Sequence, residues 1–235
     1  MALLPSNKVW DQPKFRYGVT TYDDIGEGTF NLIFALTTMF GMAVYGVFIA
    51  LFLTVKLTTL PIIALVVVAF AGCFVACSDI IPFKAIGLAM IAGGLGAVTG
   101  PYVNQFKLAS VTEIAGATVL MTLILGAIGW IYPKSFASWG TSLFVLLIAL
   151  LVLLIFAPIV YSALGLPLKG LMHALDWVGI ILFSAYLLYD FNRARDLPKS
   201  VDNAMDCGIS VFLDVANIFV RLLELFGVMK TGSDD

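Results

Sequence analysis

Charged residues, histidine and cysteine are all scarce in this chain of 235 residues. Only 12% of its residues are Asp, Glu, Lys or Arg, against about 25% in a typical soluble domain. The net charge of −2 offers no basic surface for nucleic acid. Three cysteines in apolar segments do not form the disulfide framework of a secreted domain. A single histidine, His173, without Cys or His partners gives no firm metal site, and no cofactor is indicated.

Hydrophobic residues, by contrast, make up 61% of the chain, and the mean hydropathy is +1.03. No soluble core of this length could bury so much apolar surface, so the excess must face lipid. Uncharged runs recur between isolated charges, and in a bilayer such runs must be helical because the backbone has to satisfy its own hydrogen bonds. The sequence therefore predicts an all-α integral membrane protein, a seven-transmembrane-helix bundle.

Charges and helix-breaking residues set the predicted boundaries. Ser200 or Asp202 can cap the seventh helix, and Pro158, Gly165 and Pro167 predict a loop over Tyr161–Lys169. We expect a polar N-terminal tail over residues 1–29, a membrane domain over residues 30–228 and a short polar tail over residues 229–235. The predicted helices are Phe30–Val55, Pro61–Cys77, Ala85–Tyr102, Ile114–Ile131, Phe136–Ala157, Gly170–Asp190 and a seventh that ends near Val228.

Lysine and arginine in the short loops predict the orientation of the bundle. With the N-terminus inside, the inner side receives Lys8, Lys14, Arg16, Lys84, Lys134, Arg193, Arg195 and Lys199. The outer side receives Lys56, Lys107, Lys169 and Lys230. This excess places the N-terminus in the cytoplasm. Seven full spans leave the C-terminus outside, whereas a re-entrant seventh helix leaves it inside.

Small residues are concentrated in the third predicted helix, at Gly93, Gly96 and Gly100. The last two form a GxxxG pair, which lets two helices approach closely. The step from Gly100 to Pro101 predicts an end or a kink in this helix. We therefore expect close helix packing here, with a functional hinge as the alternative.

The last two predicted helices carry charges within their apolar segments, unlike the first five. Ionisable groups at membrane depth are costly and usually face the bundle interior or water. In the last helix, the positions i, i+3, i+7 and i+10 form one polar stripe of Asp214, Asn217, Arg221 and Glu224. We expect this helix to be central, with the stripe facing inward.

Two aspartates lie symmetrically about the turn between these helices. Asp190 and Asp214 are each twelve residues from Asp202, so they can meet across an antiparallel hairpin. Two carboxylates about 4 Å apart repel by roughly 4 kcal/mol at an effective dielectric of 20, so the pair would share a proton. The alternative interpretation pairs Asp190 with Arg193 and Asp214 with Arg221.

The segments around both aspartates carry a family pattern. Leu188–Ala194 contains an aromatic-Asp motif, and Phe212–Gly227 follows the pattern L-D-x-x-N-x-F-x-x-L-L-x-x-x-G. Together with the small residues of Gly93–Pro101, these motifs resemble the Bax inhibitor-1 family (transmembrane Bax inhibitor motif proteins). The family's arginine near the second helix has no counterpart here; Asp79 and Lys84 are the nearby charges.

The resemblance implies a pH-sensitive cation leak channel in a bacterial inner membrane, because in bacterial members the two motif aspartates form a proton-sensing pair that governs a calcium leak. Asp190 and Asp214 are then the sensor, and calcium near them is the expected permeant ion. The supporting polar network consists of Arg193, Asn217, Arg221 and Glu224. For the missing arginine, Arg193 or Arg221 is the expected substitute.

A regulatory protein without transport is the main alternative. It would bind an FtsH-type membrane protease, or act in a stress or cell-death pathway, through its N-terminal tail. An enzyme is not expected, since no Gly-x-Ser-Gly nucleophile is paired with a histidine. Tyr189-Asp190 suits an aspartyl membrane protease, but Asp214 lacks the Gly-x-Gly that would precede it.

Overall fold

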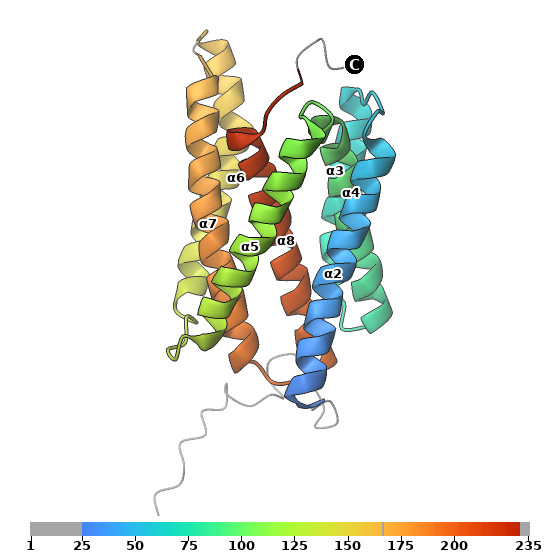
Figure 1. Cartoon of the computed structure of the whole chain (residues 1–235), viewed down its shortest axis with the longest axis vertical. Coiled ribbons are helices and arrows are strands. Elements are labelled where there is room, and N and C mark those ends of the chain that lie inside the picture. Colours follow the sequence, from blue (N-terminus) through green and yellow to red (C-terminus); the bar gives the residue numbers. More distant parts are fainter. Residues whose placement is uncertain (1–24, 166, 231–235) are drawn as a thin grey trace, which may run out of the picture.

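The computed structural model describes residues 25–165 and 167–230, which confirm the all-helical prediction. Within these ranges there is no strand beyond one isolated bridge between Phe106 and Met229. Figure 1 shows α2 beginning at one end of the bundle, the N-terminal end, and α8 finishing at the other, the C-terminal end. The helices are α2 (Gly26–Phe52), α3 (Thr59–Ala76), α4 (Ile81–Val103), α5 (Leu108–Ile131), α6 (Trp139–Ala163), α7 (Lys169–Asp196) and α8 (Val201–Phe226).

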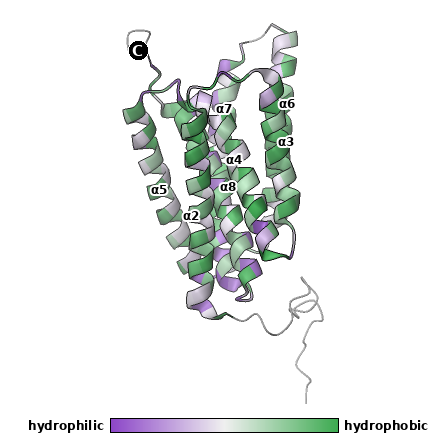
Figure 2. Cartoon of the chain, turned by 90° about the vertical axis from the view of Figure 1, so that its right-hand side faces the viewer, coloured by the Kyte–Doolittle hydropathy of each residue, from purple (hydrophilic) through white to green (hydrophobic). Residues whose placement is uncertain are grey.

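The helices α2 to α7 are long and apolar enough to cross a membrane. Their outward faces are hydrophobic: the side chains of Leu60, Leu123 and Phe156 are 76%, 65% and 57% exposed. Figure 2 shows hydrophobic residues along the length of the helices and hydrophilic residues gathered towards the ends. Such extensive apolar surface requires lipid around it, so the chain is a multi-pass integral membrane protein.

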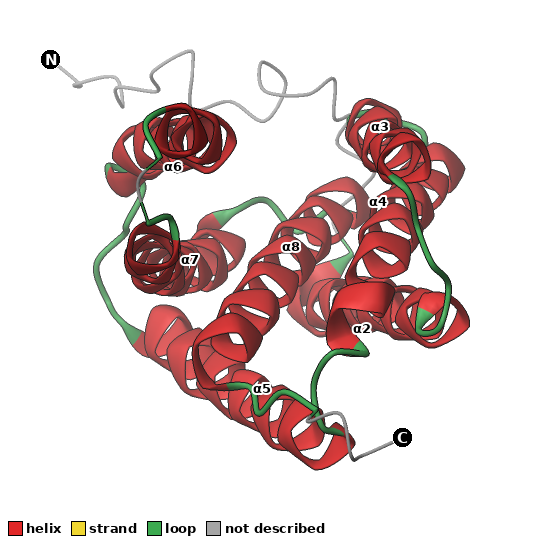
Figure 3. Ribbon diagram, turned by 90° about the horizontal axis from the view of Figure 1, so that it is seen from above, coloured by secondary structure: helices red, strands yellow, loops and turns green. Residues whose placement is uncertain are grey.

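The last helix, α8, differs because it is amphipathic and carries charges along its length. It packs against α2, α4, α5 and α7, and Figure 3 shows it between α7 on one side and α2 and α4 on the other. As predicted, Ser200 caps it, since the Ser200 side chain accepts a hydrogen bond from the Asn203 N–H. The helix runs along most of the height of the bundle (Figure 1), but it is not among the described helices that are apolar enough to cross a membrane.

Glycines let α4 lie close to both α2 and α3. A Cβ atom at Gly96 would lie 2.5 Å from the carbonyl oxygen of Tyr45, and one at Gly100 would lie 2.7 Å from that of Ile49. On the other side, a Cβ atom at Gly87 would lie 2.4 Å from the α3 backbone. Backbone atoms cannot yield as the tip of a side chain can, so these contacts depend on glycine.

Prolines end fewer helices than the sequence predicts. The helix α4 passes through Pro101, and α6 passes through Pro158 and ends at Ala163. The predicted loop over Tyr161–Lys169 is therefore wrong at its start, and at its end too because α7 begins at Lys169. In a bilayer, leaving the helix would expose more backbone groups than the one hydrogen bond that proline removes. The chain turns instead at Gly165, where φ is +66°.

Charged residues also lie inside helices where the sequence predicts ends. The helix α7 continues six residues past Asp190, and Leu197, the residue before Pro198, is the first extended one, with ψ of 152°. Two arginines in this last turn interact favourably with the helix dipole. Similarly, α5 begins at Leu108, so Glu113 lies within the helix rather than at its start.

The substitution Gly96→Ala should lower the free energy of unfolding by about 1–3 kcal/mol, because the new Cβ atom must displace the α2 backbone. Gly116→Ala is the matched control: it also lies inside a helix, but its Cβ would meet nothing within 4 Å. The measurement is the thermal unfolding midpoint in detergent. Equal midpoints for the two variants would contradict the packing described here.

Candidate functional site

Asp190 of α7 and Asp214 of α8 meet inside the bundle. Both are 5% exposed, and their carboxyl groups lie within hydrogen-bonding distance of each other. Among the described residues no N–H or O–H donor reaches Oδ2 of Asp214. A carboxylate without a donor in apolar surroundings is costly. One proton held between the two groups supplies the missing hydrogen bond, so the geometry suits a carboxyl–carboxylate pair.

The hairpin geometry explains how the two aspartates meet. Asp190 is six residues, or about 9 Å, from the end of α7, whereas Asp214 is thirteen residues, or about 20 Å, from the start of α8. The connection over residues 197–200 is extended at both ends, at Leu197 and at Ser200. This extended link takes up the difference in height, so neither helix has to fray.

Arg193, Tyr186 and Cys207 surround the aspartate pair. Arg193 lies close enough to attract the Asp190 carboxylate, and Tyr186 lies near both carboxyl groups. The buried Cys207 thiol is also close to Asp190. Of these groups Arg193 is the one that carries a permanent charge, so it is the candidate for stabilising an ionised Asp190.

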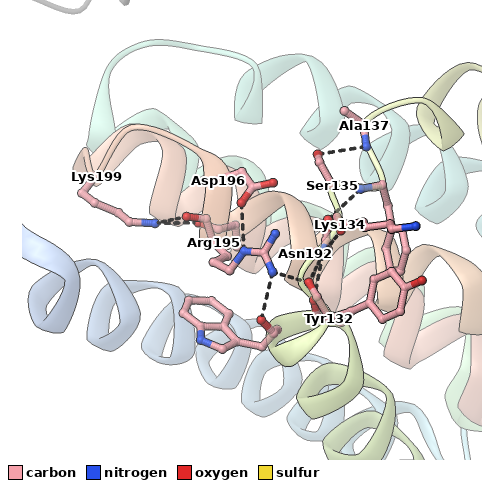
Figure 4. A network of polar contacts seen from close by, with 12 residues as sticks. Tyr132, Lys134, Ser135, Ala137, Asn192, Arg195, Asp196 and Lys199 are labelled. Atoms are coloured by element: carbon pink, nitrogen blue, oxygen red, sulfur yellow. Dashed lines mark hydrogen bonds and ion pairs between the residues drawn. The ribbon is translucent and has the colours of Figure 1, made fainter.

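Asn192, two residues after Asp190, fixes the end of α7 against the α5–α6 connection (Figure 4). It is completely buried, and its Oδ1 accepts a hydrogen bond from the N–H of Phe136 at 2.8 Å. Its Nδ2 donates towards three carbonyl oxygens at 3.0, 3.3 and 3.1 Å, those of Gly129, Tyr132 and Lys134. One amide thus satisfies several backbone groups that would otherwise be buried without partners.

Arg195 and Lys199 extend this network (Figure 4). Arg195 donates to the carbonyl oxygens of Trp130 and Tyr132. The Lys199 ammonium donates to two carbonyl oxygens in the last turn of α7 and lies 4.6 Å from the centroid of the Phe30 ring. Burial lowers the pKa of Lys199. The segment that carries Asp190 is therefore held firmly at the N-terminal end.

A polar cavity of about 370 Å³ lies between α3, α4 and α8. Lys84, only 2% exposed, bridges two aspartates of α8: its Nζ lies 2.8 Å from Oδ1 of Asp202 and also contacts Asp206. The cavity is lined further by Arg193 and Asp79. Arg193 therefore connects the cavity to Asp190.

A second buried ion pair lies towards the C-terminal end. Nη1 of Arg221 is 3.0 Å from Oδ1 of Asp176 on α7. The alternative pairing of Arg221 with Asp214 is therefore wrong. Asp176 of α7 is the acid in contact with the guanidinium, whereas Asp214 is seven residues, or about 10 Å, from Arg221 along α8.

The predicted polar stripe on the last helix is buried only in part. Asp214 and Arg221 are buried, whereas Glu224 is exposed at the C-terminal end and does not face the interior. Asn217 donates to the carbonyl oxygen of Leu213, within its own helix. The stripe drifts around the helix because a spacing of ten residues does not return to the same face.

Comparison with known proteins identifies the family. The family described as "Inhibitor of apoptosis-promoting Bax1" matches residues 28–231. The chain belongs to the Bax inhibitor-1 family. The resemblance inferred from the motifs of the last two helices is thereby confirmed.

The similar proteins are bacterial and distant. An uncharacterized protein of Helicobacter pylori is 25% identical over 132 residues, 56% of this chain and 54% of the relative. An uncharacterized membrane protein of Vibrio cholerae is 25% identical over 146 residues, 60% of this chain and 62% of the relative. The Escherichia coli inner membrane protein YbhL is 24% identical over 144 residues, 56% of this chain and 59% of the relative. The chain thus matches less than two thirds of these relatives.

Asp176, Asp202, Asp206 and Lys84 are site residues that the sequence-based prediction did not include. Asp176 and Asp206 are charges within predicted apolar helices, which is a signal for a site, whereas Lys84 and Asp202 lie in the first turns of their helices and carry no such signal. The partner of Arg221 could have been found by asking which acid on the neighbouring helix it can reach.

Asn192→Asp should lower the free energy of unfolding by about 1–3 kcal/mol for each carbonyl oxygen left without a donor. The matched control is Asn217→Asp, which loses a single contact to its own helix. Thermal unfolding in detergent measures both variants. If the two midpoints fall equally, the network of Figure 4 does not hold α7 in place.

Proposed function

We propose that this protein is a pH-sensitive cation leak channel, with calcium as a permeant ion and Asp190 and Asp214 as the proton sensor. The observation that carries the proposal is the contact between these two buried carboxyl groups from adjacent helices. Membership of the Bax inhibitor-1 family agrees with it.

The proton on the pair controls how α7 and α8 fit together. With one shared proton, a hydrogen bond joins the two helices across their interface, which is called the seam below. When that proton leaves, two adjacent carboxylates repel by about 4 kcal/mol at a separation of 4 Å and an effective dielectric of 20. Repulsion of this size is a large part of the stability of a helix contact, so the seam loosens. Two negative charges then face the gap and attract cations.

The polar cavity supplies a route from the N-terminal end to the pair. Its lining reaches from Asp79 through Lys84 to Arg193 and Leu213. Leu213 directly precedes Asp214, so the cavity reaches the turn of α8 that carries one of the two sensor residues. The proposal keeps the prediction that the last helix is the central element, and the contacts of α8 with four other helices support it.

The positive-inside rule orients this route. Lys84, Lys134, Arg193, Arg195 and Lys199 lie at the N-terminal end, which we therefore place in the cytoplasm. The relative from Escherichia coli is an inner membrane protein by name, and the proposal puts this chain in a membrane of the same kind. The polar cavity then opens towards the cytoplasm.

Calcium flux into proteoliposomes measured from pH 5 to pH 8 tests the proposal. We expect the flux to be several-fold lower at pH 5, where the shared proton is held, than at pH 8. Asp214→Asn should abolish this dependence, because an amide donates a hydrogen bond to Asp190 at every pH and keeps the seam closed. Asp190→Asn should behave in the same way.

Glu113→Gln removes one negative charge at an exposed position of α5 and is the control. It should retain the pH dependence. A flux that is absent at every pH would overturn the leak proposal and favour the alternative, a regulatory protein that binds a membrane protease. The N-terminal tail named for that binding lies, up to residue 24, outside the described residues.

A further inference from the structure

The Asp176–Arg221 ion pair is unusually enclosed for a group so near the end of the bundle. The two side chains are 12% and 9% exposed. Nη1 of Arg221 also lies 3.5 Å from the carbonyl oxygen of Leu175, and the guanidinium carbon lies 5.7 Å from the centroid of the Phe183 ring. Nε of Arg221 has no partner among the described residues. The arginine is therefore held in one place between α7 and α8.

Gly179 makes the space in which Arg221 lies. A Cβ atom at this position would be 2.2 Å from Nε and 2.4 Å from Cδ of Arg221. Real Cβ contacts are never so short, so any other residue at 179 would push the arginine away from Asp176. The glycine is three residues, or about one turn, from Asp176 on α7, and the arginine side chain crosses the helix there. The sequence thus provides both the ion pair and, at Gly179, the space in which the arginine side chain lies.

An apolar layer separates this ion pair from the aspartate sensor. Asp176 and Asp190 are fourteen residues apart on α7, or about 21 Å. The buried side chains on the α7 and α8 faces between them are hydrophobic and less than 10% exposed: Ile180, Phe183, Leu187, Val215 and Ile218. A cation that has reached the sensor from the polar cavity must pass this layer and then the guanidinium.

We propose that the Asp176–Arg221 pair, seated on Gly179, is a second gate at the C-terminal end of the path, in series with the aspartate sensor. This inference rests on the proposed leak. While Arg221 is paired, its guanidinium fills the seam between α7 and α8. When the pair breaks, a buried arginine without a counter-ion is costly, so its side chain moves towards water and leaves the seam. Two further ionisable residues lie close to this gate: His173 is near Asp176, and Glu224 is exposed about one turn beyond Arg221.

Accessibility of a single cysteine tests the gate without relying on flux. Cys73, Cys77 and Cys207 are first replaced by alanine, and Ile218→Cys is introduced into the apolar layer on the sensor side of Arg221. A charged, membrane-impermeant thiol reagent is added to full-length protein in proteoliposomes, on each side in turn. Gly179→Ala should increase the modification rate from the C-terminal side several-fold, and should increase calcium flux as well.

Gly170→Ala is the matched control, because it lies on the same helix and its Cβ atom would meet nothing within 4 Å. Its modification rate should equal that of the parent protein. Asp176→Asn is the second variant: it adds no volume, so it breaks the ion pair even if Gly179→Ala does not fold. It should raise both modification and flux.

The outcomes separate the gate from the leak. Unchanged modification in folded Gly179→Ala and Asp176→Asn proteins would overturn the gate, even if the parent protein conducts calcium. Increased modification without any calcium flux at any pH would support the closure at Arg221 and overturn the leak. Increased modification together with increased flux would support both.

Discussion

A charge removed from water inside a bilayer requires a partner, and α8 is where the partners in this bundle meet. The buried charged residues of the described chain are Lys84, Asp176, Asp190, Asp214 and Arg221. Two of them belong to α8, and each of the others contacts a side chain of α8. Because an unpaired charge here would cost several kcal/mol, these contacts fix how α4 and α7 lie against α8. Replacing one partner of a pair would leave the other charge buried without a counter-ion.

The spacing of the charged residues along α8 and the packing of the neighbouring helices bring each charge to its partner. Asp206, Asp214 and Arg221 follow one another at intervals of eight and seven residues, about two helical turns. Asp214 and Arg221 therefore lie on nearly the same side of α8, whereas Asp206 is turned by about 80° towards α4. Their partners come from α4 for the first and from α7 for the other two. Glycines on α4 draw α2 and α3 close on the far side, which leaves the face with Lys84 against α8.

The sequence predicts the aspartate pair of the α7–α8 hairpin, but it misses the Asp176–Arg221 pair of the same hairpin and the contacts of Lys84. Asp190 and Asp214 can be paired by counting from the turn, because the geometry of an antiparallel hairpin is local. Lys84 cannot be assigned to Asp202 and Asp206 in this way, since its position depends on how α4 packs. The loop predicted after Pro158 is wrong for another reason. Proline ends helices in soluble proteins, but in lipid the cost of exposing further backbone groups is larger than the cost of the proline, so the helix continues.

The order of charges along the seam bears on which ions the proposed leak would carry. At the N-terminal end, Lys84 balances only one of its two aspartates, so that layer has one net negative charge. The sensor pair with one shared proton has one negative charge, which Arg193 faces, and the Asp176–Arg221 layer is neutral. The layer of Lys84 therefore attracts cations, and the sensor adds a net negative charge only when its shared proton is lost. Loss of the shared proton strengthens this preference, so the charge that loosens the seam also selects the ion.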